Sequence, residues 1–241
     1  MRTLAVGDIH GCSKAFDRLL EVVQLQPEDK LITLGDYVDK GPNSNEVLNR
    51  LLKLAQNHQL IPLKGNHEMA MLAARQEGRL QDFWLAMGGK ETLESYPKQG
   101  NIQTLANIPD DHWEFIDRHC LDWYETDDHI FVHANLDPDL PLHKQSEHDL
   151  FWQKLYPHDP HYSGKIVICG HTSQKDGQPV NLGHQICIDT WACGDGWLSC
   201  LDVDTGKLWQ TNQKGQVRTT VLKNQRKSGQ DPSLRAFLSY L

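Results

Sequence analysis

Length, composition and charge limit the kind of protein that this chain can be. It has 241 residues, of which 39% are hydrophobic and 23% charged, and its formal net charge is -8. These values are typical of a globular protein with one large core. The acidic balance argues against broad nucleic-acid binding, which requires a basic face. A small phosphorylated substrate remains compatible with it, because a bound metal ion can invert the local field.

The cysteines and the N-terminus bear on the compartment. None of the six cysteines belongs to a Cys-x-x-Cys pair, so the sequence does not indicate a structural zinc site. A disulfide framework is compatible with an even count, but a domain of this size does not depend on one. We interpret the cysteines as free thiols. With no signal peptide and no apolar run of about 18 residues, we expect a cytoplasmic protein without a membrane partner.

The N-terminal part contains three apolar runs, each followed by a polar turn and a helical pattern. The runs are residues 3–6, 31–34 and 60–63. The first helix is expected to start at a capping Ser13 and the second at about Asn43, because apolar residues then recur at three-to-four spacing. Three such units predict a βαβαβ arrangement with parallel strands. The polar turns should gather at the carboxyl ends of these strands, where α/β sheets place their sites.

The remainder of the chain changes from helical to strand patterns. Residues 69–128 are mostly helical, and we interpret them as an insertion near the site. Apolar runs then return, and the last two flank a hairpin turn; the runs are 130–132, 166–169, 185–188, 197–203 and 208–211. This order predicts an α/β fold at the boundary with α+β, in which a second sheet packs on the first.

The domain organisation is predicted to be simple. One catalytic domain covers residues 1–211 and includes the helical insertion at 69–128. The stretch 212–241 is polar and basic, so we interpret it as a loosely held tail with a short helix from Pro232.

Several apolar runs end directly at residue types that bind metal ions. These residues are Asp8 and His10, Asp36, Asn66, His133 and His171. Glycines flank four of the five turns, and glycine lets the backbone turn sharply and approach closely. Imidazole, carboxylate and amide ligands together suit manganese, iron or zinc rather than calcium.

The balance of charge favours two divalent ions. Their four positive charges meet one negative charge each from Asp8 and Asp36, and a hydroxide and an incoming phosphate can supply the rest. We predict that Asp36 bridges the two ions, and we expect manganese, with iron or zinc as alternatives. The remaining ligands divide into Asp8 and His10 on one ion, and Asn66, His133 and His171 on the other.

A histidine and an aspartate are predicted to carry the proton transfer. His67 directly follows Asn66, so we expect it beside the metals without binding one. It would protonate the leaving oxygen of the substrate. Asp39 would hold the His67 imidazole in the correct tautomer and keep it charged.

These residues lie in motifs that resemble a known family. The motifs are GDIHG (7–11), GDYVDKG (35–41), GNHE (65–68), the histidine of FVHA (131–134) and GHT (170–172). In order and spacing they resemble the five signatures of the phosphoprotein phosphatase family of metallophosphoesterases. Residues 188–206 also resemble the closing strands of its bacterial serine/threonine phosphatases.

The resemblance carries expectations for fold and chemistry. It implies a calcineurin-like fold, with a central β-sandwich of two mixed sheets flanked by helices and a dinuclear metal site at its edge. It also implies hydrolysis of phosphate monoesters by direct attack of metal-bound hydroxide, without a phosphoenzyme.

The chain departs from the family pattern at two cationic positions. The family usually has arginine at the position of Lys40, and a second arginine aligns with Lys154. We expect both lysines to bind substrate together with Asn66. Since lysine offers phosphate a point charge and arginine a two-bond grip, we expect weaker phosphate binding or altered substrate choice. Asn135 and Trp191 stand where glycine is common, so they are expected to reshape the rim of the pocket.

Three functions compete on this basis. The first is a protein serine/threonine phosphatase that acts on a phosphorylated protein or a small phosphate ester, and the presence of Asp39 favours it. The alternative is a symmetrical dinucleoside tetraphosphate hydrolase, which shares the five signatures. The third is a phosphate-binding scaffold without turnover, which the complete set of predicted ligands argues against.

Overall fold

The structure is a computed structural model and describes residues 1–57, 60–98 and 103–222. Its strands form two sheets. The six-stranded sheet has the order β11 (Val217–Val221), β10 (Lys207–Thr211), β9 (Leu198–Asp202), β1 (Thr3–Val6), β2 (Lys30–Thr33) and β3 (Leu60–Pro62). The five-stranded sheet has the order β4 (Trp123–Glu125), β5 (His129–Val132), β6 (Ile166–Cys169), β8 (Gln185–Cys187) and β7 (Val180–Asn181).

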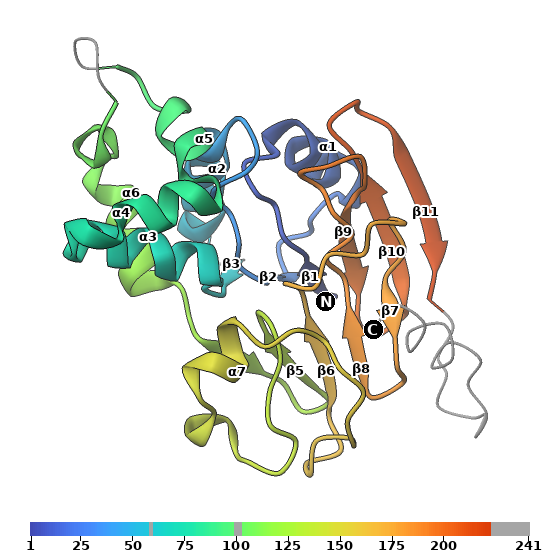
Figure 1. The fold of residues 1–241 in the computed structure, drawn as a ribbon. Coiled ribbons are helices and arrows are strands. Elements are labelled where there is room, and N and C mark those ends of the chain that lie inside the picture. The colour runs from blue at the N-terminus through green and yellow to red at the C-terminus, as the bar shows by residue number, and fades with distance from the viewer. Residues whose placement is uncertain (58–59, 99–102, 223–241) are drawn as a thin grey trace.

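Helices flank the two sheets, and α2 to α6 gather on one side of the molecule (Figure 1). The α-helices are α1 (Ser13–Val23), α2 (Ser44–Gln56), α3 (Asn66–Gln76), α4 (Gln81–Trp84), α5 (Lys90–Glu94), α6 (Asp110–Glu114) and α7 (Glu147–Phe151). Short 3₁₀ turns lie at η1 (Gly78–Leu80), η3 (Leu105–Asn107) and η5 (Leu142–Lys144), and π-type turns at η2 (Leu85–Gly89) and η4 (Phe115–His119). In the part of the chain described, no helix has the length and apolar character needed to cross a membrane.

The strand pairing confirms the predicted parallel units. Strand β2 lies parallel to both β1 and β3. The predicted hairpin is also present, as β9 and β10 pair antiparallel. Strand β9 pairs antiparallel with β1 as well, so it joins the C-terminal strands to the N-terminal units in one sheet.

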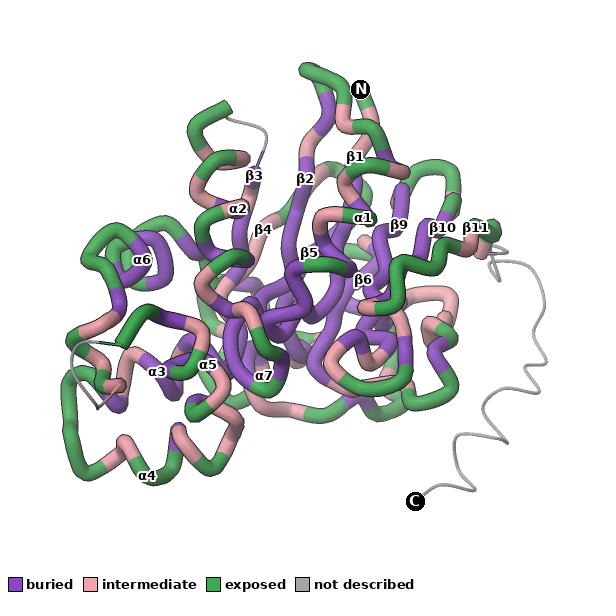
Figure 2. The backbone as a smooth tube through the Cα atoms, turned by 90° about the horizontal axis from the view of Figure 1, so that it is seen from above, coloured by how far each residue is buried: buried purple, intermediate pink, exposed green. Residues whose placement is uncertain are grey.

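Alternating side chains of the central strands enter two different cores. In β1, Leu4 and Val6 belong to the core beneath the helices, while Ala5 belongs to the core shared by the two sheets. In β5, Phe131 enters the shared core, and its neighbour Ile130 enters the core on the outer face of the second sheet. Strands buried on both faces read as continuous apolar runs, which is why these strands were evident in the sequence. Figure 2 shows the buried backbone concentrated in the strands.

Some details differ from the sequence-based expectation. Residues 217–221, within the range predicted as a tail, form the edge strand β11, which pairs with β10 along its length. The rest of that range, 223–241 with the predicted helix from Pro232, lies outside the described residues. Strand β4 lies inside the range predicted as helical, because pairing with β5 decides its conformation. Ser13 does not cap α1; its hydroxyl donates to Glu46 Oε2 at 2.6 Å.

The start of the central sheet depends on a buried ion pair. The Asp29 carboxylate, 2% exposed, accepts hydrogen bonds from the backbone N–H and the guanidinium of Arg2 and from the N–H of Gln26. Burial opposes the charge, but these donors outweigh it and lower the pKa of Asp29 to about 2. The pair therefore stabilises the beginning of β1 against the turn before β2.

We predict that Asp29→Asn lowers the free energy of unfolding by about 2 kcal/mol at pH 7. The folded pKa lies below the unfolded value near 4, so this contribution is complete above pH 4 and is lost as the pH falls towards 2. Urea unfolding of parent and variant at a series of pH values measures it. The matched control is Asp17→Asn, which removes the exposed pair with Arg50 and should cost only a few tenths of a kcal/mol. A pH-independent difference for Asp29→Asn would contradict the assignment.

Candidate metal centre

The predicted ligands lie where strands end. Asp8 and His10 follow β1, Asp36 follows β2, and Asn66 begins the helix after β3; His133 follows β5 and His171 follows β6. All six side chains are buried. The two sheets therefore bring residues that are far apart in the sequence to one edge of the sandwich.

Glycines allow the backbones of these turns to touch. A Cβ atom on Gly41 would lie 1.9 Å from the carbonyl oxygen of His10. A Cβ atom on Gly65 would lie 2.2 Å from Asp36 Oδ1, and one on Gly170 would lie 2.1 Å from Asp8 Oδ1. No other residue type fits at such distances, so the glycines are needed for close approach around the carboxylates.

Three histidines share one hydrogen-bonding arrangement. His10 Nδ1 lies 2.8 Å from the carbonyl oxygen of Val38, and His133 Nδ1 lies 2.7 Å from that of Leu34. His171 uses its other nitrogen, Nε2, which lies 3.1 Å from the carbonyl oxygen of Trp152. A carbonyl accepts only, so each ring donates an N–H outward, and in its neutral form the opposite nitrogen has a lone pair for a metal.

The opposite nitrogens converge on oxygen atoms of Asp36 and Asn66, and one of them, His10 Nε2, also lies 3.0 Å from Lys40 Nζ. His10 Nε2 lies 3.3 Å from Asp36 Oδ2, and His133 Nε2 lies 3.4 Å from Asp36 Oδ1. Asn66 Oδ1 lies 3.0 Å from both His133 Nε2 and His171 Nδ1. Imidazole nitrogens and carboxylate and amide oxygens that converge in this way are the donor set of a divalent metal ion, so the residues present fit such ions.

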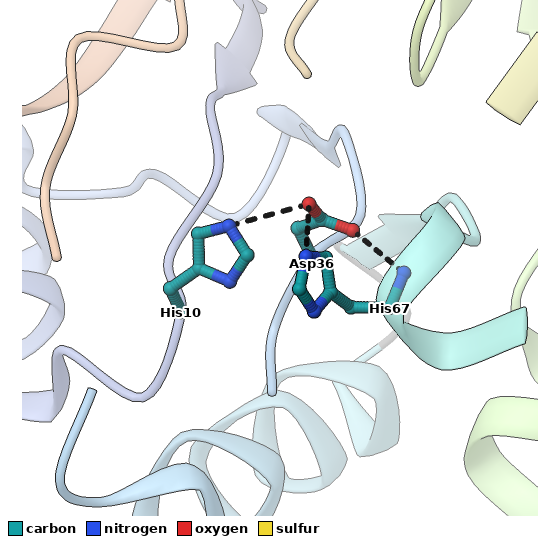
Figure 3. Close-up of side chains that lie close together, drawn as sticks. All are labelled: His10, Asp36 and His67. Atoms are coloured by element: carbon teal, nitrogen blue, oxygen red, sulfur yellow. Dashed lines mark hydrogen bonds and ion pairs between the residues drawn. The ribbon is translucent and has the colours of Figure 1, made fainter. Parts of the chain in front are cut away.

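Among the described residues, two groups of side chains are compact enough to hold an ion. One contains His10, Asp36 and His67, and the other contains Asp36, His133 and His171. Asp36 belongs to both, as expected of a bridge, and Figure 3 shows the imidazoles of His10 and His67 near each other and both close to its carboxylate. Asp8 lies outside both groups, because its carboxylate accepts the backbone N–H of His171 at 3.0 Å.

The electrostatics of the pocket also favour cations. Burial raises the pKa of Asp8 well above its usual value, and the charges of Asp189 and Asp36 raise it further. Burial lowers the pKa of His171 to about 3, with contributions from His133 and Lys154. His171 is therefore neutral near pH 7 and keeps a lone pair for a metal. Positive ions would offset the mutual repulsion of the buried carboxylates.

His67 is held differently from the other three histidines. Its Nδ1 lies 2.8 Å from Asp39 Oδ2, so its partner is a carboxylate instead of a carbonyl. The same carboxylate accepts hydrogen bonds from Trp84 Nε1 at 3.1 Å and from Thr92 Oγ1 at 2.7 Å. Trp84 and Thr92 come from the helical insertion, so the insertion fixes the orientation of Asp39. The sequence did not single out either residue, since an apolar periodicity says nothing about an indole N–H.

Glu68 connects two of the turns, a role that was not predicted from the sequence. Its buried carboxylate accepts the backbone N–H groups of Gly65, Asp36, Tyr37 and Val38 at 2.8–3.3 Å. Burial raises its pKa to about 7, and the charge of Asp36 contributes. Its position three residues after Gly65, at the start of a helix, was the available signal.

Both predicted substrate-binding lysines reach the centre. Lys40 Nζ lies 3.0 Å from His10 Nε2, and Lys154 Nζ donates to the carbonyl oxygen of His171 at 3.2 Å. Asn135 is fully buried and accepts a hydrogen bond from Gln185 at 3.0 Å, so it packs within the second sheet rather than forming the rim.

Comparison with known proteins identifies the family. The family described as calcineurin-like phosphoesterase matches residues 1–187. The chain belongs to this family. The metallophosphoesterase resemblance and the fold of two mixed sheets flanked by helices are thereby confirmed. Membership implies a dinuclear site for divalent metals, and the two groups that share Asp36 fit such a site.

Two curated relatives carry the same name, symmetrical bis(5'-nucleosyl)-tetraphosphatase. The protein of Acidovorax ebreus (strain TPSY) is 43% identical over 102 residues, which cover 39% of this chain and 36% of the relative. That of Pseudomonas syringae pv. syringae (strain B728a) is 32% identical over 152 residues, which cover 61% of this chain and 46% of the relative. The chain thus spans about a third to a half of the length of these relatives.

A solved structure agrees with the fold. It is described as that of a candidate diadenosine tetraphosphatase, with a TM-score of 0.63 and 21% identity, over 92% of this chain and 94% of the other. At this level of identity the similarity shows the fold alone.

The prediction of a serine/threonine protein phosphatase is wrong. The relatives are named for a dinucleotide substrate, which favours the alternative function. The argument from Asp39 fails for a physical reason. Asp39 is hydrogen-bonded to His67, and a proton donor at that position would serve any phosphorus–oxygen leaving group, so the pair does not distinguish a phosphoprotein from a dinucleotide.

We predict that Asp36→Asn removes both metal ions together, because the carboxylate is shared by the two groups. Metal affinity should fall by more than the roughly 10–100-fold that loss of an outer-shell partner costs. Mass-spectrometric metal analysis of desalted protein measures the content. His67→Asn is the matched control and should keep both ions, because Asp8 and His10 are the ligands proposed beside Asp36, and His67 is the proposed proton donor held by Asp39. Full metal content in Asp36→Asn, or equal loss in the control, would contradict the assignment.

Proposed function

We propose that this protein hydrolyses symmetrical dinucleoside tetraphosphates to two nucleoside diphosphates. The names of the relatives support this substrate class. The observation that carries the chemistry is the Asp36 carboxylate, which faces unprotonated histidine nitrogens on both of its oxygens. The substrate joins its central phosphates through an oxygen atom, so one attack by water separates it into equal halves.

The ligand set is proposed as Asp8, His10, Asp36, Asn66, His133 and His171, with manganese the preferred ion and iron or zinc as alternatives. When bound, such ions activate water and clamp the phosphoryl group under attack. The chain's own contribution is to hold the ligand atoms in place. Backbone carbonyls fix the tautomers of three histidines, and Asn66 Oδ1 bridges the nitrogens of His133 and His171.

His67 is proposed as the residue that donates a proton to the leaving phosphate oxygen. Its Nδ1–H is bound to Asp39, so Nε2 is the nitrogen that faces the centre, 3.9 Å from Asp36 Oδ2. The carboxylate of Asp39 stabilises the protonated imidazole. Trp84 and Thr92 hold Asp39 in position for this purpose.

Lys40 and Lys154 are proposed to bind the phosphates that do not react, together with Asn66. A tetraphosphate carries several negative charges, and the chain itself is acidic, with a net charge of -8. The two lysines contact His10 and His171, which belong to different metal groups. They therefore place positive charge at both ends of the centre, as a polyphosphate that crosses it requires.

The cytoplasm is the proposed compartment. All six cysteines are free, and Cys12, Cys120, Cys169, Cys187 and Cys200 are buried. Free thiols are the ordinary state of cysteine in a reducing compartment, which supports this part of the proposal.

We predict that manganese-loaded protein converts diadenosine tetraphosphate to adenosine diphosphate as the sole nucleotide product. Chromatography of the reaction mixture identifies the product, and a phosphopeptide panel run in parallel should turn over more slowly. Formation of adenosine triphosphate with adenosine monophosphate would contradict symmetrical cleavage. Metal-loaded protein that hydrolyses no phosphate compound would support the non-catalytic scaffold instead.

We predict that His67→Asn lowers kcat about a hundredfold on phenyl phosphate, a magnitude typical of a lost general acid. The loss on diadenosine tetraphosphate should be smaller, because a nucleoside diphosphate is a weaker base than phenoxide and depends less on protonation. Steady-state kinetics on both substrates give the ratio, with metal content checked in each preparation. Equal losses on the two substrates, or none on either, would contradict the role of His67.

A further inference from the structure

Left-handed backbone conformations single out one residue beyond the proposed site. Among the described residues, seven other than glycine have φ between 44° and 70°: His10, Gln24, Asp36, Asp39, Lys40, His171 and Trp191. Gln24 ends helix α1, and five of the others are proposed site residues. Strained conformations persist where the surrounding structure holds them, and they cluster at functional sites. For a residue as bulky as tryptophan, the conformation at Trp191 is a clear outlier.

The loop that carries Trp191 lies beside the metal centre. The backbone N–H of Trp191 donates to Asp189 Oδ1 at 3.0 Å, and Asp189 is close enough to Asp8 for its charge to act on that carboxyl. Ser173 Oγ donates to Asp189 Oδ2 at 2.5 Å, and Ser173 lies two residues after His171 in the chain. The loop therefore borders the centre on the side of Asp8 and His171.

The loop is built around the Trp191 indole. A Cβ atom on Gly194 would lie 2.2 Å from Trp191 Cε2, so the ring rests directly on the glycine backbone. The N–H groups of Gly194 and Gly196 both donate to the carbonyl oxygen of Trp191, at 3.1 and 3.2 Å. The side chain remains half-buried, so part of the ring stays accessible while its position is held by the loop.

We propose that Trp191 is a stacking platform for one nucleobase of the substrate. This inference rests on the proposed function and names the subsite that it requires. A base is separated from the reacting phosphates by a sugar and a further phosphate, so it must lie on the rim rather than at the metals. An indole face binds any base by stacking. The subsite therefore accepts different nucleobases, with purines favoured because their rings cover more of the indole.

The test varies the enzyme and the substrate together. The variant is Trp191→Gly, since glycine adopts the left-handed conformation without strain. The substrates are diadenosine tetraphosphate and bis(5'-ribosyl) tetraphosphate, which keeps the phosphates and sugars and lacks both bases. With the dinucleotide, KM should rise roughly tenfold or more in the variant, the range expected for a lost stacking contact. With the ribosyl compound, parent and variant should have the same KM.

Trp191→Phe is the matched control, because it keeps an aromatic face and should recover most of the affinity for the dinucleotide. An equal rise in KM for both substrates in Trp191→Gly would show that the residue only shapes the loop and would overturn the proposal. No rise for either substrate would overturn it as well.

A binding measurement separates this proposal from the proposed function. Adenosine diphosphate is titrated into metal-loaded protein while tryptophan fluorescence is recorded. Quenching in the parent that is absent in Trp191→Gly supports a base subsite, even if the tetraphosphate is not hydrolysed and the proposed function fails. Identical titrations of parent and variant would overturn the subsite, whatever the protein hydrolyses.

Discussion

The convergence of unprotonated lone pairs on the Asp36 carboxylate is the constraint on which the rest of this structure depends. Two histidine nitrogens face its two oxygens at 3.3 and 3.4 Å, and all three side chains are buried. Without cations such an arrangement would be unfavourable, because buried lone pairs need a proton or a metal between them. The fold tolerates it as part of a metal centre, and the geometry of the surrounding turns follows from that requirement.

The turns are strained, and identifiable contacts hold them. Asp36, Asp39 and Lys40 lie in one turn and all have left-handed backbones. Glu68 accepts N–H groups from this turn, and Gly88 of the insertion accepts the N–H of Lys40 at 3.2 Å. Strain of this kind costs on the order of 1–3 kcal/mol per residue. Hydrogen bonds to a buried carboxylate are strong enough to offset much of that cost.

The sequence predicted the framework well because the relevant signals are local. Strands buried on both faces appear as apolar runs, and the predicted ligands follow those runs directly, so the strand ends and the shared edge could be anticipated. Strand β11 could not be anticipated, because its residues are mostly exposed and show no apolar pattern. Its conformation depends on pairing with β10. The side chains that donate hydrogen bonds to Asp39 could not be predicted from the sequence either. Trp84 and Thr92 are separated from Asp39 by 45 and 53 residues, and only the tertiary structure brings them together.

The failed substrate prediction has the same physical origin. The proposed metal ligands and the His67–Asp39 pair would act on the phosphorus atom and its leaving oxygen, which phosphoproteins and dinucleotides have in common. Substrate choice therefore has to come from side chains that contact the parts of the substrate beyond the reacting phosphoryl group. Lys40 and Lys154 are proposed to meet additional phosphates, and the half-buried indole of Trp191 has no counterpart in the chemistry of the phosphoryl group itself. A motif shared by hydrolases of different substrates identifies the reaction, while the residues at its rim carry the information about what is hydrolysed.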